Sequence, residues 1–231
     1  MPPSRQIPIS FPETRLSFQD MAVTDATRSI CAAIRKPDRW PYHAFCLIGP
    51  KGSGVTTLAQ AWSEERKAHY IEAAKLSEIE VSDIETMTET DLVVDDVHDL
   101  NDAEALLLLL SGIKRHQKHI LLAAHTVPSL WRVQSPDLKS RLQAAPLAEI
   151  PAPDEPLMRV RLKRAFARSY LDLPGPVEDY LVTRLGLDYA LIEHTAETLA
   201  GATGDRPLTI PLARDILGEE GDGEVAEDHQ G

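Results

Sequence analysis

Short apolar runs alternate with amphipathic stretches along the first two thirds of the chain. Continuous apolar runs are found at 44–48, 92–94 and 120–124, with a short candidate strand at 70–71 and a weak fifth at 147–150, which contains Glu149. Apolar residues at helical spacing are found at 17–34, 56–67 and 103–116. Buried strands that alternate with helices are typical of a parallel sheet covered by helices on both faces. We therefore expect an α/β domain over residues 16–152.

The pattern changes after Pro151 and Pro153. From there on only helical spacing is found, at 155–171, 176–185, 190–202 and near 212–217. This predicts a small all-helical domain over residues 153–217. The Pro-rich segment 1–15 has no periodicity and predicts an extended arm. Residues 218–231 carry six acidic residues and no Lys or Arg, which is typical of a disordered tail.

Composition narrows the class of protein. The chain has 231 residues, enough for a sizeable core, and a formal net charge of −12. This acidic balance argues against direct DNA binding, which normally needs a basic surface. No apolar run approaches the roughly 18 residues that a membrane helix needs, and the N-terminus lacks the apolar core of a secretion signal. Cys31 and Cys46 form no metal-binding pattern, so we expect a cytoplasmic location and exclude a structural zinc site.

A glycine-rich turn links the first apolar run to the next helix. It consists of Gly49, Pro50, Lys51, Gly52, Ser53, Gly54, Val55 and Thr56, with Thr57 following. A turn of this kind that opens a helix resembles a phosphate-binding P-loop, in which backbone N–H groups and the helix N-terminus attract phosphate oxygens. Thr56 occupies the position of the magnesium-binding hydroxyl. Val55, however, replaces the lysine that normally reaches the β- and γ-phosphates.

Three interpretations of this turn remain open. The backbone alone can hold a diphosphate, which predicts ADP, with magnesium, and little hydrolysis by this chain. Lys51 is a substitute cation in a second interpretation, which predicts a weak ATPase. In the third, the turn keeps its shape only for packing and binds no nucleotide.

A second motif, resembling a Walker B strand, follows about forty residues downstream. The apolar run 92–94 ends in Asp95 and Asp96, and acids at the carboxyl end of a parallel strand face the ligand crevice. Asp95 is the candidate magnesium ligand, and Asp96 the candidate for orienting an attacking water. The alternative is an acidic helix start, since Asp99 also precedes the helix at 103.

These motifs, in this order, resemble a known family. Residues 5–217 resemble the AAA+ domain of DnaA-related proteins. The resemblance lies in the order of the motifs along the chain: Phe18, the P-loop, Asp95–Asp96, Ser140–Arg141 and a helical lid. Within that family, the shorter Hda-like regulators of replication initiation are the best match. The resemblance implies a P-loop AAA+ domain with a helical lid, a role in the control of replication, and the initiator DnaA as partner.

The resemblance also assigns roles to particular segments. The arm contains Gln6, Ile7, Ile9 and Phe11 in a pattern similar to peptides that bind the DNA polymerase sliding clamp. Arg141 matches the family's arginine finger, which acts on the nucleotide of a neighbouring subunit. The chain ends where DnaA would continue into its DNA-binding domain, so no sequence-specific DNA binding is expected. Association with a second copy of this chain stays open.

The chain also departs from the family pattern. His125 stands at the sensor position after the fourth strand, and Ala190 at the lid position of a nucleotide-sensing arginine. The chain's own pocket therefore lacks three groups that normally support hydrolysis: the lysine, a standard sensor and the lid arginine. These losses do not affect an arginine finger that acts in trans on a partner's nucleotide. A nucleotide-free scaffold resembling clamp-loader subunits is the alternative function. A basic run on the first lid helix is expected to be a solvated face, or else to contact an acidic partner: Arg159, Arg161, Lys163, Arg164 and Arg168.

Overall fold

A parallel β-sheet forms the centre of the first unit in the computed structural model, which describes residues 25–204 and 206–221. Its strands are β1 (Ala44–Ile48), β2 (His69–Glu72), β3 (Leu92–Asp95), β4 (Ile120–Ala124) and β5 (Leu147–Glu149). They are arranged in the order β2-β3-β4-β1-β5, and every pairing is parallel. The predicted α/β class is therefore confirmed.

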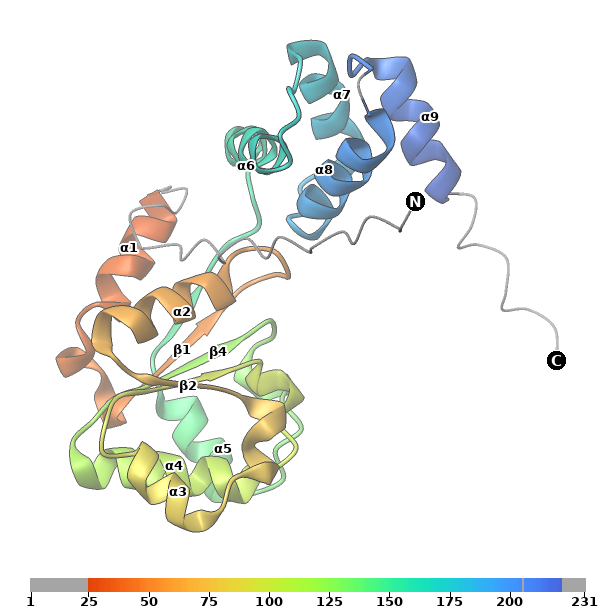
Figure 1. The fold of residues 1–231 in the computed structure, drawn as a ribbon. Coiled ribbons are helices and arrows are strands. Elements are labelled where there is room, and N and C mark those ends of the chain that lie inside the picture. The colour runs from red at the N-terminus through yellow and green to blue at the C-terminus, as the bar shows by residue number, and fades with distance from the viewer. Residues whose placement is uncertain (1–24, 205, 222–231) are drawn as a thin grey trace, which may run out of the picture.

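Helices cover both faces of this sheet (Figure 1). One face is covered by α1 (Asp25–Ile34) and α2 (Val55–Arg66), and the other by α3 (Val81–Met87), α4 (Ala103–His116) and α5 (Pro136–Ala144). Strand residues alternate between the two cores: Phe45 and Leu47 pack with α2, whereas Cys46 and Ile48 pack with α4. Because both of their faces are buried, the central strands β1 and β4 are apolar throughout and show no alternation in sequence.

Local sequence sets the ends of several elements. Asp102 caps α4 by accepting hydrogen bonds from the backbone N–H groups of Glu104 and Ala105, and Ser135 caps α5 through Leu138. Short 3-10 turns complete the connections at Pro37–Arg39, Pro41–His43, Ala73–Glu78, Val97–Asp99 and Pro128–Leu130. The sequence pattern did not predict α3 or α5.

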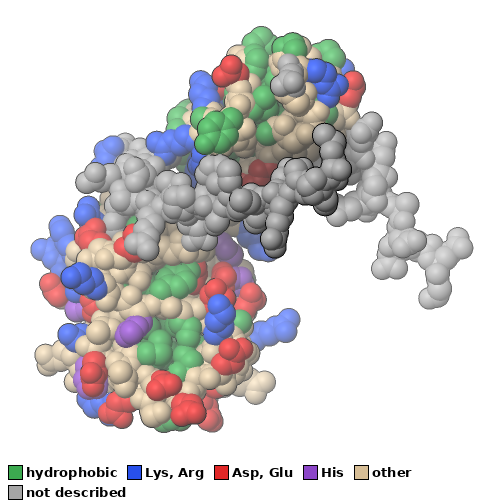
Figure 2. Space-filling model, viewed as in Figure 1, with side chains coloured by type: hydrophobic (Ala, Val, Ile, Leu, Met, Phe, Trp, Pro, Cys, Tyr) green, Lys and Arg blue, Asp and Glu red, His purple; other side chains and the backbone are tan. Residues whose placement is uncertain are grey.

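The second unit is a bundle of four helices within the described residues, α6 (Glu155–Arg168), α7 (Gly175–Leu185), α8 (Ala190–Thr203) and α9 (Ile210–Gly221). Its core is its own, because every member of that cluster lies between Leu157 and Leu217. The all-helical prediction agrees with this bundle, although α9 continues to Gly221, past the expected end at 217. On the visible face of the molecule, acidic and basic side chains are interspersed over the α/β unit (Figure 2).

Candidate nucleotide site

The glycine-rich loop after β1 turns sharply back into α2. Gly52 and Gly54 have φ angles of +74° and +99°, in the left-handed region that favours glycine. A Cβ at Gly49 would lie 2.7 Å from Ser53 Oγ and 2.9 Å from Ile150 Cβ, so a side chain there would not fit. The loop therefore needs its glycines, and it leads directly into the N-terminus of a helix of 12 residues.

Val55 begins that helix and points into the protein core. Its residue surface is 1% exposed, and it packs in the same cluster as Leu58 and Trp62. Lys51, at the tip of the loop, is exposed. Position 55 therefore supplies packing and no positive charge.

Asp95 is buried at the carboxyl end of β3 and has a partner that the sequence did not reveal. The Tyr70 hydroxyl donates a hydrogen bond to Asp95 Oδ2, and the backbone N–H of Asp96 donates to Oδ1 at 2.9 Å. Burial raises the pKa of the Tyr70 hydroxyl, and the hydrogen bond to Asp95 raises it further. Both carboxylate oxygens are thus engaged within the chain, and the magnesium role of Asp95 stays a prediction.

Asp96 lies beside two histidines at the same end of the sheet. Its Oδ1 is 3.8 Å from His125 Nε2 and 4.0 Å from His98 Nδ1. Burial and the neighbouring Asp95 charge raise the pKa of Asp96, while the two histidines lower it. His125 Nδ1 is 3.0 Å from the Gly49 carbonyl oxygen, so the ring N–H donates to the loop. The structure therefore brings together three predicted site residues, Gly49, Asp96 and His125, and it also places His98 there, which the sequence did not indicate.

No metal site stands out in the part of the chain that the structure describes. Among residues 25–204 and 206–221, no group of three or more His, Cys, Asp or Glu is placed to hold a metal ion. Over the same residues, no helix is both long and apolar enough to span a bilayer.

The lid contacts the loop through Arg161 and Tyr189. Arg161 Nη2 donates to the Ser53 carbonyl oxygen at 2.5 Å, and the guanidinium carbon lies 5.1 Å from the centroid of the Tyr189 ring. The Tyr189 hydroxyl donates to the Pro151 carbonyl oxygen at 3.2 Å. A Cβ at Gly52 would lie 2.8 Å from the Tyr189 carbonyl oxygen and 3.0 Å from the Ala190 nitrogen. The start of α8, including the predicted sensing position Ala190, therefore lies against the loop.

The prediction of one solvated basic face on α6 is wrong for Arg161. Successive helical residues are about 100° apart, so residues 159 and 161 lie on nearly opposite sides. Arg159 forms ion pairs with Glu155 and Asp179 on the outside of the bundle. Arg161 is turned toward the loop instead.

Arg141 lies at the protein surface on α5, on the sheet face opposite α2 (Figure 1). Its side chain is 37% exposed. Nε and Nη2 donate to the two carboxylate oxygens of Asp137 at 3.1 and 3.0 Å, and Nη1 donates to Ser111 Oγ at 3.0 Å. The guanidinium is therefore held by its own chain while remaining accessible to solvent.

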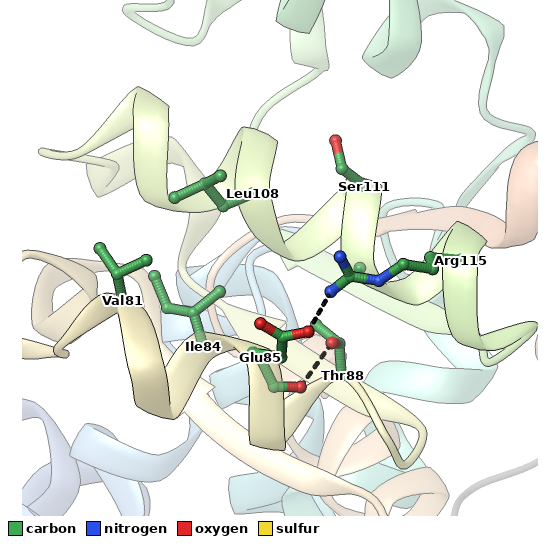
Figure 3. A pocket seen from close by; sticks show the side chains of 8 residues that line it. Val81, Ile84, Glu85, Thr88, Leu108, Ser111 and Arg115 are labelled. Carbon is green, nitrogen blue, oxygen red and sulfur yellow. Dashed lines mark hydrogen bonds and ion pairs between the residues drawn. The ribbon is translucent and has the colours of Figure 1, made fainter.

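A pocket of about 160 Å³ between α3 and α4 adjoins this arginine through Ser111. Figure 3 shows Val81 and Ile84 of α3 and Leu108 of α4 at one end of it. At the other end Arg115 forms an ion pair with Glu85, at 2.8 Å between Nη2 and Oε1. The surface beside Arg141 is thus partly apolar.

The predicted clamp-binding residues Gln6, Ile7, Ile9 and Phe11 lie outside the described residues, as does Phe18. Those interpretations stay predictions.

Comparisons with known proteins connect the chain to solved structures. No protein-family model matches it, and no curated protein matches it by sequence. Domain III of the replication initiation protein DnaA from Thermotoga maritima superposes with a TM-score of 0.74, covering 91% of this chain and 98% of that one at 17% identity. AMPPCP-bound DnaA from Aquifex aeolicus gives a TM-score of 0.70, covering 92% of this chain and 72% of that one at 20% identity.

The chain has the fold of DnaA domain III. This fold is also shared with a point variant of Thermotoga maritima RuvB, with a TM-score of 0.66, coverage of 88% of this chain and 71% of that one, and 19% identity. In this chain the loop after β1, the acids after β3 and His125 after β4 all lie at the carboxyl ends of neighbouring strands. Ligands of open parallel sheets bind at that edge.

Proposed function

We propose that this AAA+ chain is an Hda-like regulator of replication initiation, which promotes ATP hydrolysis by DnaA through an arginine finger supplied in trans. The observation that carries the proposal is the separation of two cation positions. Val55 is buried where the loop would need a lysine, whereas Arg141 is solvent-accessible on the other side of the sheet. The chain is poorly equipped to cleave its own nucleotide and well equipped to reach another subunit's.

The chemistry of the guanidinium fits this role. Charge develops on the oxygens of the γ-phosphate as the bond breaks, and an arginine placed there from a neighbouring subunit typically accelerates hydrolysis about 10³–10⁵-fold. Arg141 has the fork geometry for two phosphate oxygens, and only exposed contacts to Asp137 and Ser111 have to be exchanged.

The arm supplies the second part of the proposal. Gln6 would hydrogen-bond to the sliding clamp while Ile9 and Phe11 fill an apolar pocket on it. The clamp loaded on DNA would then concentrate the regulator near the initiator, and the acidic chain itself would need no direct contact with DNA.

Initiator ATP hydrolysis tests both parts together. The assay contains DnaA, clamp loaded on DNA, and wild-type protein, Arg141→Ala, Gln6→Ala or the control Lys139→Ala, an exposed residue on the same helix. We expect Arg141→Ala to lose the stimulation, Gln6→Ala to lose it only at low protein concentration, and Lys139→Ala to retain it. Full stimulation by Arg141→Ala would refute the finger, and full stimulation by Gln6→Ala at every concentration would refute the tether.

The weak-ATPase alternative depends on Lys51 and Asp96. Lys51 is exposed, which leaves it free to turn toward a phosphate. ATP turnover by the purified protein that disappears in Asp96→Asn would favour this alternative over the regulator.

A further inference from the structure

Two buried polar groups without a hydrogen-bond partner lie where the lid meets the loop. They are Ser53 Oγ and Arg161 Nε. Ser53 is 2% exposed, and its hydroxyl is turned into the loop, toward the place that a Cβ on Gly49 would take. Buried polar groups in native proteins are nearly always paired, so two orphans at one junction point to a missing ligand.

The Arg161 guanidinium also has no carboxylate partner within the described residues. Its guanidinium donates to one carbonyl oxygen and packs over the Tyr189 ring, and within the described part of the chain it forms no ion pair with Asp or Glu. Burial lowers the pKa of Arg161, and Tyr189 and Glu193 only partly oppose this. A partly buried cation without a counter-ion is costly, and an anion bound beside it would offset that cost.

The surroundings fit a phosphate group. The loop leads into the N-terminus of α2, whose first N–H groups and dipole favour an anion. A serine hydroxyl and a guanidinium add donors of the kind that phosphate oxygens accept. Figure 2 shows Lys and Arg side chains gathered around α6, where the lid approaches the α/β unit.

We propose that Arg161 binds a phosphate group of a nucleoside diphosphate held in the loop, so that the lid supplies the cation that Val55 cannot. Ser53 Oγ is the second new donor in this site. The inference rests on the loop being a nucleotide site and is independent of any action of Arg141 on a partner. Since Arg161 belongs to α6 and the loop to α2, the bound phosphate would tie the lid to the α/β unit.

Binding of a fluorescent ADP analogue, N-methylanthraniloyl-ADP, to the full chain tests this site by polarisation. The variants are Arg161→Met, Arg161→Lys and Ser53→Ala, with Arg168→Met as the control. Arg168 lies on the same helix, but it is exposed and paired with Glu193. We expect Arg161→Met to weaken binding at least about tenfold, because a charge-assisted hydrogen bond is lost. Arg161→Lys should keep most of the affinity, Ser53→Ala should lose several-fold, and Arg168→Met should match wild type.

Competition identifies which part of the ligand the site recognises. Unlabelled ADP and pyrophosphate should displace the probe, and adenosine should not. Displacement by adenosine alone would overturn the proposal, as would a wild-type protein that does not bind the probe or an Arg161→Met variant that binds it as wild type does.

Thermal unfolding with and without ADP distinguishes a variant that has lost ADP binding from one that has misfolded. ADP should raise the melting temperature of wild type and of Arg161→Lys by more than that of Arg161→Met. An equal rise in all three contradicts the proposal. None of these measurements involves the initiator, so a failure here is distinguishable from a failure of the Arg141 mechanism.

Discussion

Asp137 and Arg141, one turn apart on α5, are joined by two parallel hydrogen bonds of 3.1 and 3.0 Å. The pair is exposed, and ion pairs of this kind contribute little to stability because water and salt screen them. Asp137 thus orients the Arg141 guanidinium at low cost. It also competes with any phosphate that the guanidinium would meet on a partner.

Asp137→Asn should therefore separate two effects of Asp137: the orientation of the Arg141 guanidinium, and the negative charge that competes with a partner's phosphate. The substitution removes the competing negative charge while keeping a hydrogen-bond acceptor in place. We expect initiator ATP hydrolysis to be stimulated at least as strongly as by wild type, with a gain of up to a few-fold at low salt. Complete loss of stimulation in Asp137→Asn would show that Arg141 needs the carboxylate itself.

Gly52→Ala should disturb the contact between loop and lid. The new Cβ would lie 2.8 Å from the Tyr189 carbonyl oxygen, and the φ of +74° is unfavourable for alanine. We expect a cost of about 1–3 kcal/mol, measured by thermal unfolding, and faster amide hydrogen exchange at the start of α8.

Gly201→Ala is the matched control for Gly52→Ala. Gly201 lies within α8, and a Cβ added there would meet nothing within 4 Å, so alanine should stabilise the helix by about 0.5–1 kcal/mol. Equal melting temperatures for the two variants would contradict the close contact at Gly52.

Tyr70→Phe should destabilise the edge of the sheet around Asp95. The buried carboxylate would lose a hydrogen bond to one oxygen, at a cost of about 1–3 kcal/mol, measured as a lower urea midpoint. Tyr42→Phe, at a tyrosine that is 65% exposed, is the control and should leave the midpoint unchanged. A Tyr70→Phe midpoint equal to wild type would mean that the hydrogen bond contributes no stability.

His119 should make stability depend on pH. Its Nδ1 lies 3.3 Å from Asp91 Oδ1, and Asp91 is also paired with Arg66. Burial lowers the pKa of His119 below its usual value, and Asp91 only partly opposes this. The unfolded chain therefore takes up the proton first as the pH falls below about 6.5, and the folded state loses stability between there and its own lower pKa.

His119→Gln should flatten this dependence, measured as the melting temperature between about pH 7.5 and 5, on either side of the usual histidine pKa. His69→Gln is the control, since His69 is exposed on the edge strand β2. If His119→Gln and wild type lose stability in parallel as the pH falls, another group is responsible.

Much of the fold could be predicted because its signals are local. The strand 120–124 and the helix 103–116 agree with β4 and α4, since a buried strand is apolar throughout and Asp102 marks the helix start. Helix α3 was missed because it has 7 residues, of which only Ile84 is buried, too few for a helical period to stand out.

The candidate site was predictable only in part, because some of its contacts are local in sequence and others form only when distant segments pack together. The loop and the acids after β3 are short motifs within continuous sequence. Tyr70 meets Asp95 only through the pairing of β2 with β3, and Arg161 meets Ser53 only through the docking of the lid. The first pair is 25 positions apart in the chain and the second is 108 positions apart, and contacts at such separations leave no pattern in the sequence.

The most direct test of the account is a single turnover of labelled ATP bound beforehand to the initiator, so that no other nucleotide contributes to the signal. We expect wild-type protein with clamp on DNA to accelerate conversion to ADP at least about 10³-fold over Arg141→Ala, which should leave the intrinsic rate unchanged. Equal rates with the wild-type and Arg141→Ala proteins would contradict it.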